Sequence, residues 1–335
     1  MKFVRLFCVC CVLLVNIGCT KQEKNVQEPL NSTIDIASEN DNGVVNTTSK
    51  NNISIVPFAN INIILKAEDT KGVTDIAEYF REYLKDKSDE YDLIEYNLRV
   101  GNIIFHQEYS PDGNLDHLEG LDILFPNLSS LTVRSNLSSV DIHTLPSKLV
   151  NLNLSNNKIV SFDTDGLPQT LTWLNLSNNN LSSFCIESPP HLMGLDLSFN
   201  NLFSFDTSNL PSSIISLKLS DNPIEGIFEI TQNIRDSGLG SLYLSNTLIN
   251  RITGLENLSV GTLDCANSPI EDIEEFLKLK FFMQLIIPIP QRYSDEEKEG
   301  FIKKLLEQYP DYTYWLSTVL FNRKEHLFFS HPSPE

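Results

Sequence analysis

Basic residues are scarce in this 335-residue chain. Its 25 Lys and Arg stand against 44 Asp and Glu, which gives a formal net charge of −19 at pH 7. Proteins that bind nucleic acid or anionic lipid surfaces need clustered positive charge. The composition therefore argues against both kinds of partner. It favours solubility and, among charged partners, cationic ones.

The sequence also lacks the short motifs that carry catalysis or hold cofactors. The six His residues do not cluster, and His-Glu-x-x-His, Cys-x-x-Cys, Gly-x-Ser-x-Gly and glycine-rich phosphate loops are all missing. Asp163-Thr164-Asp165-Gly166 resembles the start of a calcium loop, but the later ligands are absent. We therefore predict that the protein is not an enzyme and has no cofactor and no metal site.

Leucine, by contrast, returns at a fixed interval. A Leu-x-Leu pair, or a close substitute, begins at eight positions that are 21, 22, 21, 22, 25, 21 and 22 residues apart. A period of this size predicts a stack of short supersecondary units, with function on a repeated surface rather than in one pocket. The first residues of the pairs are Leu131, Leu152, Leu174, Leu195, Leu217, Leu242, Leu263 and Leu285.

The spacing within one unit predicts which side chains are buried. Leu152 and Leu154 are two residues apart, so on a strand both point inward while Asn153 points outward. Asn157 ends the strand, where a buried amide can bond the backbone of its own turn and of the next coil. Other units carry Asn136, Asn179, Asn200, Asn222, Thr247 and Ser268 at this point. Because Thr and Ser replace Asn in the later units, we expect this polar ladder to weaken towards the C-terminus.

Four successive units show the pattern in full. They read LVNLNLSNNKI from Leu149, LTWLNLSNNNL from Leu171, LMGLDLSFNNL from Leu192 and IISLKLSDNPI from Ile214. These segments resemble the leucine-rich repeat, L-x-x-L-x-L-x-x-N-x-L, and the resemblance extends over residues 128–290. It implies an α/β solenoid with a parallel β-sheet on its concave face.

The other half of each unit is short. Proline follows leucine in several units, as at Leu145-Pro146, which argues against long convex helices. We expect short extended or 3-10 segments there. These units resemble the short repeats of secreted bacterial effectors, whereas later ones, such as Ile270-Glu271-Asp272-Ile273, are more similar to internalin repeats. Both resemblances imply a bacterial binding module.

The N-terminus has the features of a targeting segment. Lys2 and Arg5 precede an apolar run that is too short to span a membrane and suits a signal peptide over residues 1–18. Cys19 follows a small residue, which resembles a bacterial lipoprotein cleavage site and implies lipidation of Cys19; an ordinary cleaved signal is the alternative. Residues 19–52 are polar and aperiodic, which predicts a disordered tether.

Both ends of the repeats need a cover over the open core. We expect an N-terminal cap over residues 53–127, in which 73–87 forms a helix with Ile76, Phe80, Tyr83 and Leu84 on one face. A C-terminal helical cap is expected over 291–335, where Ser294-x-x-Glu297 predicts a capping box and Phe301, Ile302, Leu305 and Leu306 an apolar face. The aromatic tail 312–329 is expected to pack beside this helix.

The cysteines that follow Cys19 are too far apart for a disulfide. Cys185 and Cys265 are separated by about four coils, roughly 19 Å at a strand spacing of 4.7–4.9 Å. A disulfide tolerates only about 7 Å between Cα atoms, so we expect none between them. Cys265 replaces the second leucine of its unit and should be a small core residue.

Outward strand positions would form the concave face, and most of them hold small or polar residues. Large apolar groups at such positions often mark interaction sites, and Trp and Tyr are frequent anchors. The alternative is that these groups cover one another or lie under a cap. The expected ligand-binding residues are Trp173, Met193, Asp196, Phe199, Lys218 and Tyr243.

Together these features predict a monomeric, non-enzymatic protein-binding module. We expect it to be lipid-anchored in the bacterial cell envelope, at the outer membrane or cell surface, with the lipid as its only membrane contact. The internalin resemblance implies a host-directed adhesin. Two alternatives stay open: a secreted effector with an activity in the flanking segments, and a structural envelope lipoprotein without a specific ligand.

Overall fold

The computed structural model describes residues 61–66, 69–87, 100–107, 115, 117–186, 191–311, 313–319 and 324–330. The expected signal peptide, Cys19 and the tether lie outside these residues. Within them, no helix is both long enough and apolar enough to cross a membrane.

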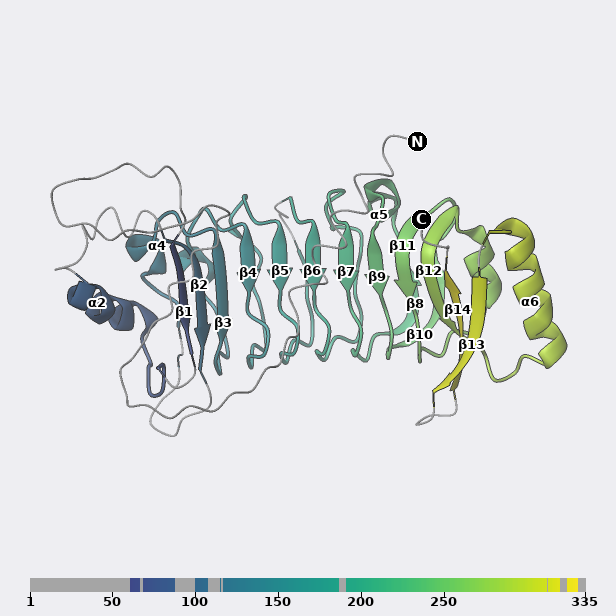
Figure 1. Ribbon diagram of the computed structural model, residues 1–335, viewed down its shortest axis with the longest axis horizontal. Helices are drawn as coiled ribbons and strands as arrows, with labels where there is room; N and C mark the ends of the chain where they lie inside the picture. The colour runs from purple at the N-terminus through teal and green to yellow at the C-terminus, as the bar shows by residue number, and fades with distance from the viewer. Residues whose placement is uncertain are drawn as a thin grey trace, which may run out of the picture. The chain divides into compact units, whose positions relative to one another are not determined.

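The described residues are built around one twelve-stranded sheet, and its first ten strands run parallel (Figure 1). Each of the eight leucine pairs contributes one strand, which confirms the leucine-rich repeat solenoid expected from the sequence. In sheet order the parallel strands are β1 (Ile61–Leu65), β2 (Val100–His106), β3 (Ser130–Arg134), β4 (Asn151–Asn153), β5 (Trp173–Asn175), β6 (Gly194–Asp196), β7 (Ser216–Lys218), β9 (Ser241–Tyr243), β11 (Ser259–Asp264) and β12 (Phe281–Pro288).

The eight leucines form a single row across the sheet. Leu131 pairs with Leu152, and the same register continues strand by strand to Leu285. Every member of the row is at most 1% exposed. Because side chains alternate between the two faces of a strand, the residues on either side of this row point outward. The spacing in the sequence therefore fixes both the interior and the exposed face.

A buried asparagine ladder runs behind the strands, as predicted. The Asn179 Nδ2 donates to the carbonyls of Leu154 and Leu176 at 3.0 and 2.9 Å, and its Oδ1 accepts from the Ile159 amide at 3.0 Å. Asn157, Asn200 and Asn222 bond in the same way, whereas Asn136 is only half-buried. The coil reached is the preceding one. We expected bonds to the next coil, which was wrong, because each side-chain amide lies beside a carbonyl of the coil that precedes it in the chain.

The ladder weakens towards the C-terminus, also as predicted. The hydroxyls of Thr247 and Ser268 each donate to a single carbonyl, that of Leu244, at 2.9 and 2.8 Å. A hydroxyl has one hydrogen to donate where an amide has two, so the later coils share fewer hydrogen bonds with their neighbours.

The convex side is short, as the prolines predict. In segments 154–172, 176–186, 191–193 and 197–215 the described residues form turns and extended backbone without a helix. Short 3-10 helices occur at Ile142–Thr144 and Ile273–Lys278. The 25-residue step accommodates helix α5 (Gln232–Ser237) and strand β8 (Glu225–Glu229), which pairs in parallel with β10 (Leu248–Thr253). The sequence did not predict this second sheet.

The region expected to be the N-terminal cap supplies strands β1 and β2 and helices α2 (Ile76–Lys87) and α4 (Leu121–Leu124). Helix α2 buries Ile76, Phe80 and Leu84 and half-buries Tyr83, as predicted. The Phe80 ring meets the edge of Phe125, with centroids 5.0 Å apart. The parallel sheet thus continues into this region.

At the other end, helix α6 (Asp295–Gln308) begins with the predicted capping box. It buries Phe301 and Leu305. The tail packs beside it as expected, with the Phe301 and Phe329 ring centroids 6.5 Å apart. The sequence did not predict that this tail forms an antiparallel hairpin, in which β14 (Lys324–Ser330) pairs with β12 and β13 (Thr313–Val319) completes the sheet.

Candidate binding surface

Two rows of outward side chains flank the leucine row. They are mostly amides and hydroxyls, so the concave face is polar but carries little charge. The first row runs from Ser130 through Asn151, Trp173, Gly194, Ser216, Ser241 and Thr262 to Gln284. The second row holds Thr132, Asn153, Asn175, Asp196, Lys218, Tyr243 and Asp264.

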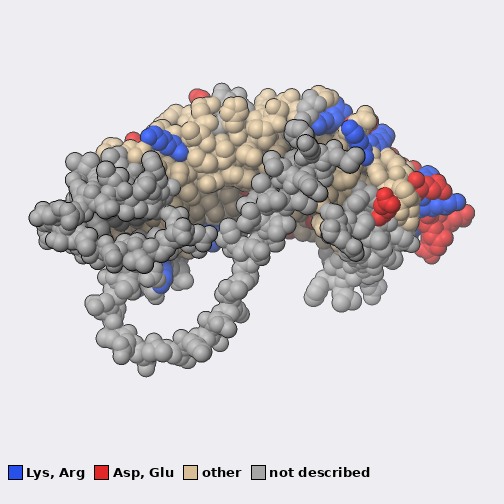
Figure 2. Space-filling view, turned by 45° about the horizontal axis from the view of Figure 1, so that its top comes forward, with Lys and Arg blue, Asp and Glu red and all other residues tan. Residues whose placement is uncertain are grey.

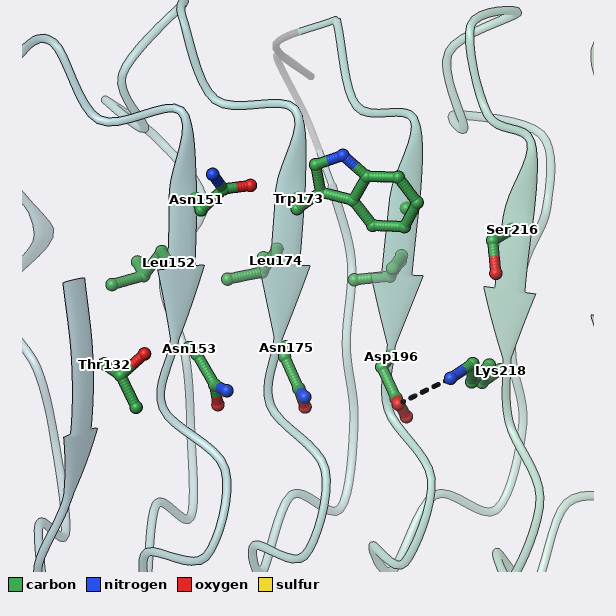
Figure 3. A pocket seen from close by; sticks show the side chains of 12 residues that line it. Thr132, Asn151, Leu152, Asn153, Trp173, Leu174, Asn175, Asp196, Ser216 and Lys218 are labelled. Carbon is green, nitrogen blue, oxygen red and sulfur yellow. Dashed lines mark ion pairs between the residues drawn. The ribbon is translucent and has the colours of Figure 1, made fainter. Parts of the chain in front are cut away.

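Trp173 lies flat on this face. Its indole extends from β5 towards β6, where a β-carbon on Gly194 would lie 3.0 Å from Cδ2 and closer still to Cε3 and Cζ3 (Figure 3). The ring can lie there only because its neighbour in the first row has no side chain. The arrangement presents an aromatic face beside polar groups. Together they form a shallow hollow of about 280 Å³, lined by Thr132, Asn151, Leu152, Asn153, Trp173, Leu174, Asn175, Gly194, Leu195, Asp196, Ser216 and Lys218.

Hydrogen bonds fix the orientation of the second row. The Oδ1 atoms of Asn153, Asn175 and Asp196 accept from the backbone amides two residues further on, at 3.0, 2.9 and 3.1 Å. This places the oxygens against the turn and leaves the Nδ2 groups of the two asparagines as donors to the hollow. The hollow therefore combines an aromatic face with preset hydrogen-bond donors.

Lys218 connects the hollow to Tyr243. Its Nζ lies 3.6 Å from the Asp196 Oδ2 and 5.9 Å from the centroid of the Tyr243 ring. The carboxylate balances the ammonium charge, and the ring face adds a cation–π contact. The pair is therefore nearly neutral as seen by a ligand.

Charge is distributed unevenly over the molecule. In the view of Figure 2, charged side chains are sparse over the repeats and gather at the end that carries α6, whose first turn holds Asp295, Glu296 and Glu297. On the concave face, burial raises the pKa of Asp264, and the nearby Asp221 carboxylate adds to the rise. Within the described residues, no three His, Cys, Asp or Glu side chains lie close enough to hold a metal ion.

The structure brings together some of the six predicted site residues. Trp173, Asp196 and Lys218 line the hollow, and Tyr243 adjoins it through Lys218. Met193 and Phe199 are exposed, at 38% and 57%, but do not line it. Sequence reasoning missed the contribution of Gly194. A glycine in register beside a tryptophan was the available signal.

Among known proteins, only solved structures match this chain. No known family model matches the chain, and no curated protein matches it. Among solved structures, it is similar to YopM from Yersinia enterocolitica at 25% identity and a TM-score of 0.41, covering 56% of this chain and 40% of that one. It is also similar to the functional domain of InlJ from Listeria monocytogenes, at 18% identity and a TM-score of 0.31, covering 57% and 50%. The chain thus spans half or less of either protein, and at these values neither likeness says what it binds.

Proposed function

We propose that this protein is a non-enzymatic module that binds a protein partner on its concave surface, with Trp173 and Tyr243 as anchors. The observation that carries the proposal is the indole held flat on Gly194 above a polar hollow. A large aromatic group held in one orientation loses little entropy on binding. Rigid Trp and Tyr side chains dominate many protein interfaces for this reason.

The surroundings of the anchors fit the same role. The same hollow is lined by the donors of Asn153 and Asn175 and by the ion pair of Asp196 and Lys218. Binding there would desolvate amides and hydroxyls that can be paired again, rather than an isolated charge, which would be costly. A neutral polar rim around an aromatic centre is typical of protein interfaces.

The test compares the affinity of one partner protein for four forms of this chain. Affinity enrichment uses wild type, Trp173→Ala, Tyr243→Ala and the control Ile123→Ala, since Ile123 is 77% exposed on α4, away from the concave rows. A partner captured by wild type and Ile123→Ala is then purified for affinity measurement. Each concave substitution should weaken binding by about 1–2 kcal/mol or more, roughly 5- to 30-fold. Unchanged affinity for both would reject the proposal.

We further propose that the module is held in the bacterial envelope by a lipid on Cys19 and acts as an adhesin for a host protein. The sequence pattern before Cys19 and the polar segment after it support this placement. Palmitate labelling with and without globomycin, followed by protease treatment of intact cells, tests it. Wild type should be labelled and cleaved, and Cys19→Ser should not be labelled. An unlabelled, protected wild-type protein would contradict the proposal.

A further inference from the structure

Every concave strand from β4 to β11 is followed by one residue in the left-handed backbone region. In all six of these coils the residue is not glycine, and its φ lies between 54° and 61°. Asn and Asp tolerate this conformation because their short polar side chains bond locally, whereas a bulky side chain is strained in it. Five of the six residues are Asn or Asp, and the sixth is an aromatic: Asn156, Asn178, Phe199, Asp221, Asn246 and Asn267.

The side chains of these residues bond from coil to coil and form a rim ladder. Asn178 donates to Asn156 at 2.6 Å, Asn246 to Asp221 at 2.9 Å and Asn267 to Asn246 at 2.8 Å. Phe199 divides the ladder into two parts, because a phenyl ring can neither donate nor accept such a bond. At this coil the protein loses ladder bonds on both sides.

The backbone at Phe199 is nevertheless that of its neighbours. Its amide donates to the Ser220 carbonyl at 2.9 Å, just as the Asn178 amide donates to the Ser198 carbonyl at 2.8 Å. The ring is 57% exposed, so it adds little to the core. Phe199 thus combines backbone strain, an interrupted ladder and an exposed aromatic ring. Strained residues that bring no local gain are concentrated at functional sites.

We propose that Phe199 is a specificity-determining anchor for an apolar, non-acidic segment of the protein partner. This rests on the proposed function, because Phe199 belongs to the coil that also places Gly194 and Asp196 in the hollow. An exposed aromatic ring is stabilised when an apolar surface covers it. Of its two neighbours in the rim ladder, Asn178 is uncharged and Asp221 carries a carboxylate, so an acidic segment is disfavoured there.

A purely structural residue and a binding anchor respond differently to Phe199→Asn. Asparagine suits the left-handed conformation and can complete the rim ladder, so the unfolding midpoint should rise. An anchor would lose binding in the same variant. Phe203→Asn is the matched control, because Phe203 lies in the same coil, is 59% exposed and has no positive φ.

The probe is a phage-displayed library of random peptides selected on the wild-type protein. Peptides selected in this way should be apolar and free of acidic residues, bind Phe199→Asn at least tenfold more weakly, and bind Phe203→Asn within twofold of wild type. Equal binding to Phe199→Asn, or a lowered unfolding midpoint in that variant, would overturn the inference. If Trp173→Ala alone weakens binding, this inference fails and the proposed function stands. If neither variant weakens binding, both fail.

Discussion

The indole of Trp173 in β5 occupies the space that a side chain on Gly194 in β6 would fill. The φ of Gly194 is not positive, so its backbone alone would accept another residue. Packing, not conformation, requires a glycine there. Gly194 is therefore part of the concave surface although it brings no functional group.

Gly194→Ala should displace the Trp173 ring. Inserting a methyl group into occupied space costs about 1–3 kcal/mol, unless the ring swings into solvent, which alters its near-UV circular dichroism. Gly300→Ala in α6 is the control, because nothing lies within 4 Å of the added carbon. It should stabilise the helix by about 0.5–1 kcal/mol. Urea unfolding and near-UV spectra that match wild type for Gly194→Ala would disprove the contact.

Asn179→Ala should destabilise the protein more than Thr247→Ala does. The Asn179 side chain makes three hydrogen bonds, to two buried carbonyls and the Ile159 amide. The carbonyls keep Asn157 and Asn200 as donors, but the amide is left unpaired, which costs about 1–3 kcal/mol in addition to the lost bonds. The Thr247 hydroxyl bonds the Leu244 carbonyl and the Ser268 hydroxyl, and that carbonyl keeps Ser268 as a donor when Thr247 is replaced. We expect losses of about 3 and about 1 kcal/mol respectively in urea unfolding at equilibrium. Equal losses would show that the two parts of the ladder contribute alike.

Most of the fold could be predicted because it follows from one period. Steps of 21 or 22 residues, with one of 25, bring Leu131 to Leu285 into a single row, and each coil repeats the same contacts with its neighbour. The β13–β14 hairpin and the β8–β10 pair could not be predicted. Their apolar runs occur once each, and a short run without a period does not reveal its partner.

The candidate site could be predicted only in part. Alternation along the strands placed Trp173, Asp196 and Lys218 on the exposed face. Contacts between side chains of different coils depend on the orientation of each side chain, and the sequence pattern does not give that orientation. The Trp173 ring turns towards Gly194, and the Asn153 oxygen turns to its own backbone. These orientations depend on contacts that form only when the coils have stacked.

Asp264→Asn should stabilise the protein at neutral pH. Burial raises the pKa of Asp264 above its ordinary value of 3.8, so the folded protein holds this proton more tightly than the unfolded chain does. The ionised carboxylate therefore lowers the stability at pH 7, and this cost shrinks as the pH falls through the folded-state pKa. The gain from Asn should be lost in acid, below about pH 4.

Asp206→Asn provides the opposite case for the same pH series. The amide and hydroxyl of Ser208 bond the Asp206 carboxylate and lower its pKa, so ionisation of this group favours the folded state. Asn at this position should bring no gain in stability at pH 7. Urea midpoints between pH 3 and pH 7 test the contrast. A stability gain from Asp264→Asn that stayed constant with pH would contradict its assignment as a half-buried, ionised carboxylate.

Ser294→Ala should loosen the C-terminal end without disturbing the central coils. The Ser294 hydroxyl accepts from the Glu297 amide at 3.2 Å, while the Glu297 carboxylate accepts from the Ser294 amide at 2.7 Å. Loss of such a cap costs about 0.5–2 kcal/mol. Because each coil of a solenoid contacts only its neighbours, the cost should fall on α6 and the adjoining strands. Amide hydrogen exchange should therefore accelerate in α6, β12 and β14 and stay unchanged from β4 to β7. A uniform increase would instead mean that the solenoid opens as one cooperative unit.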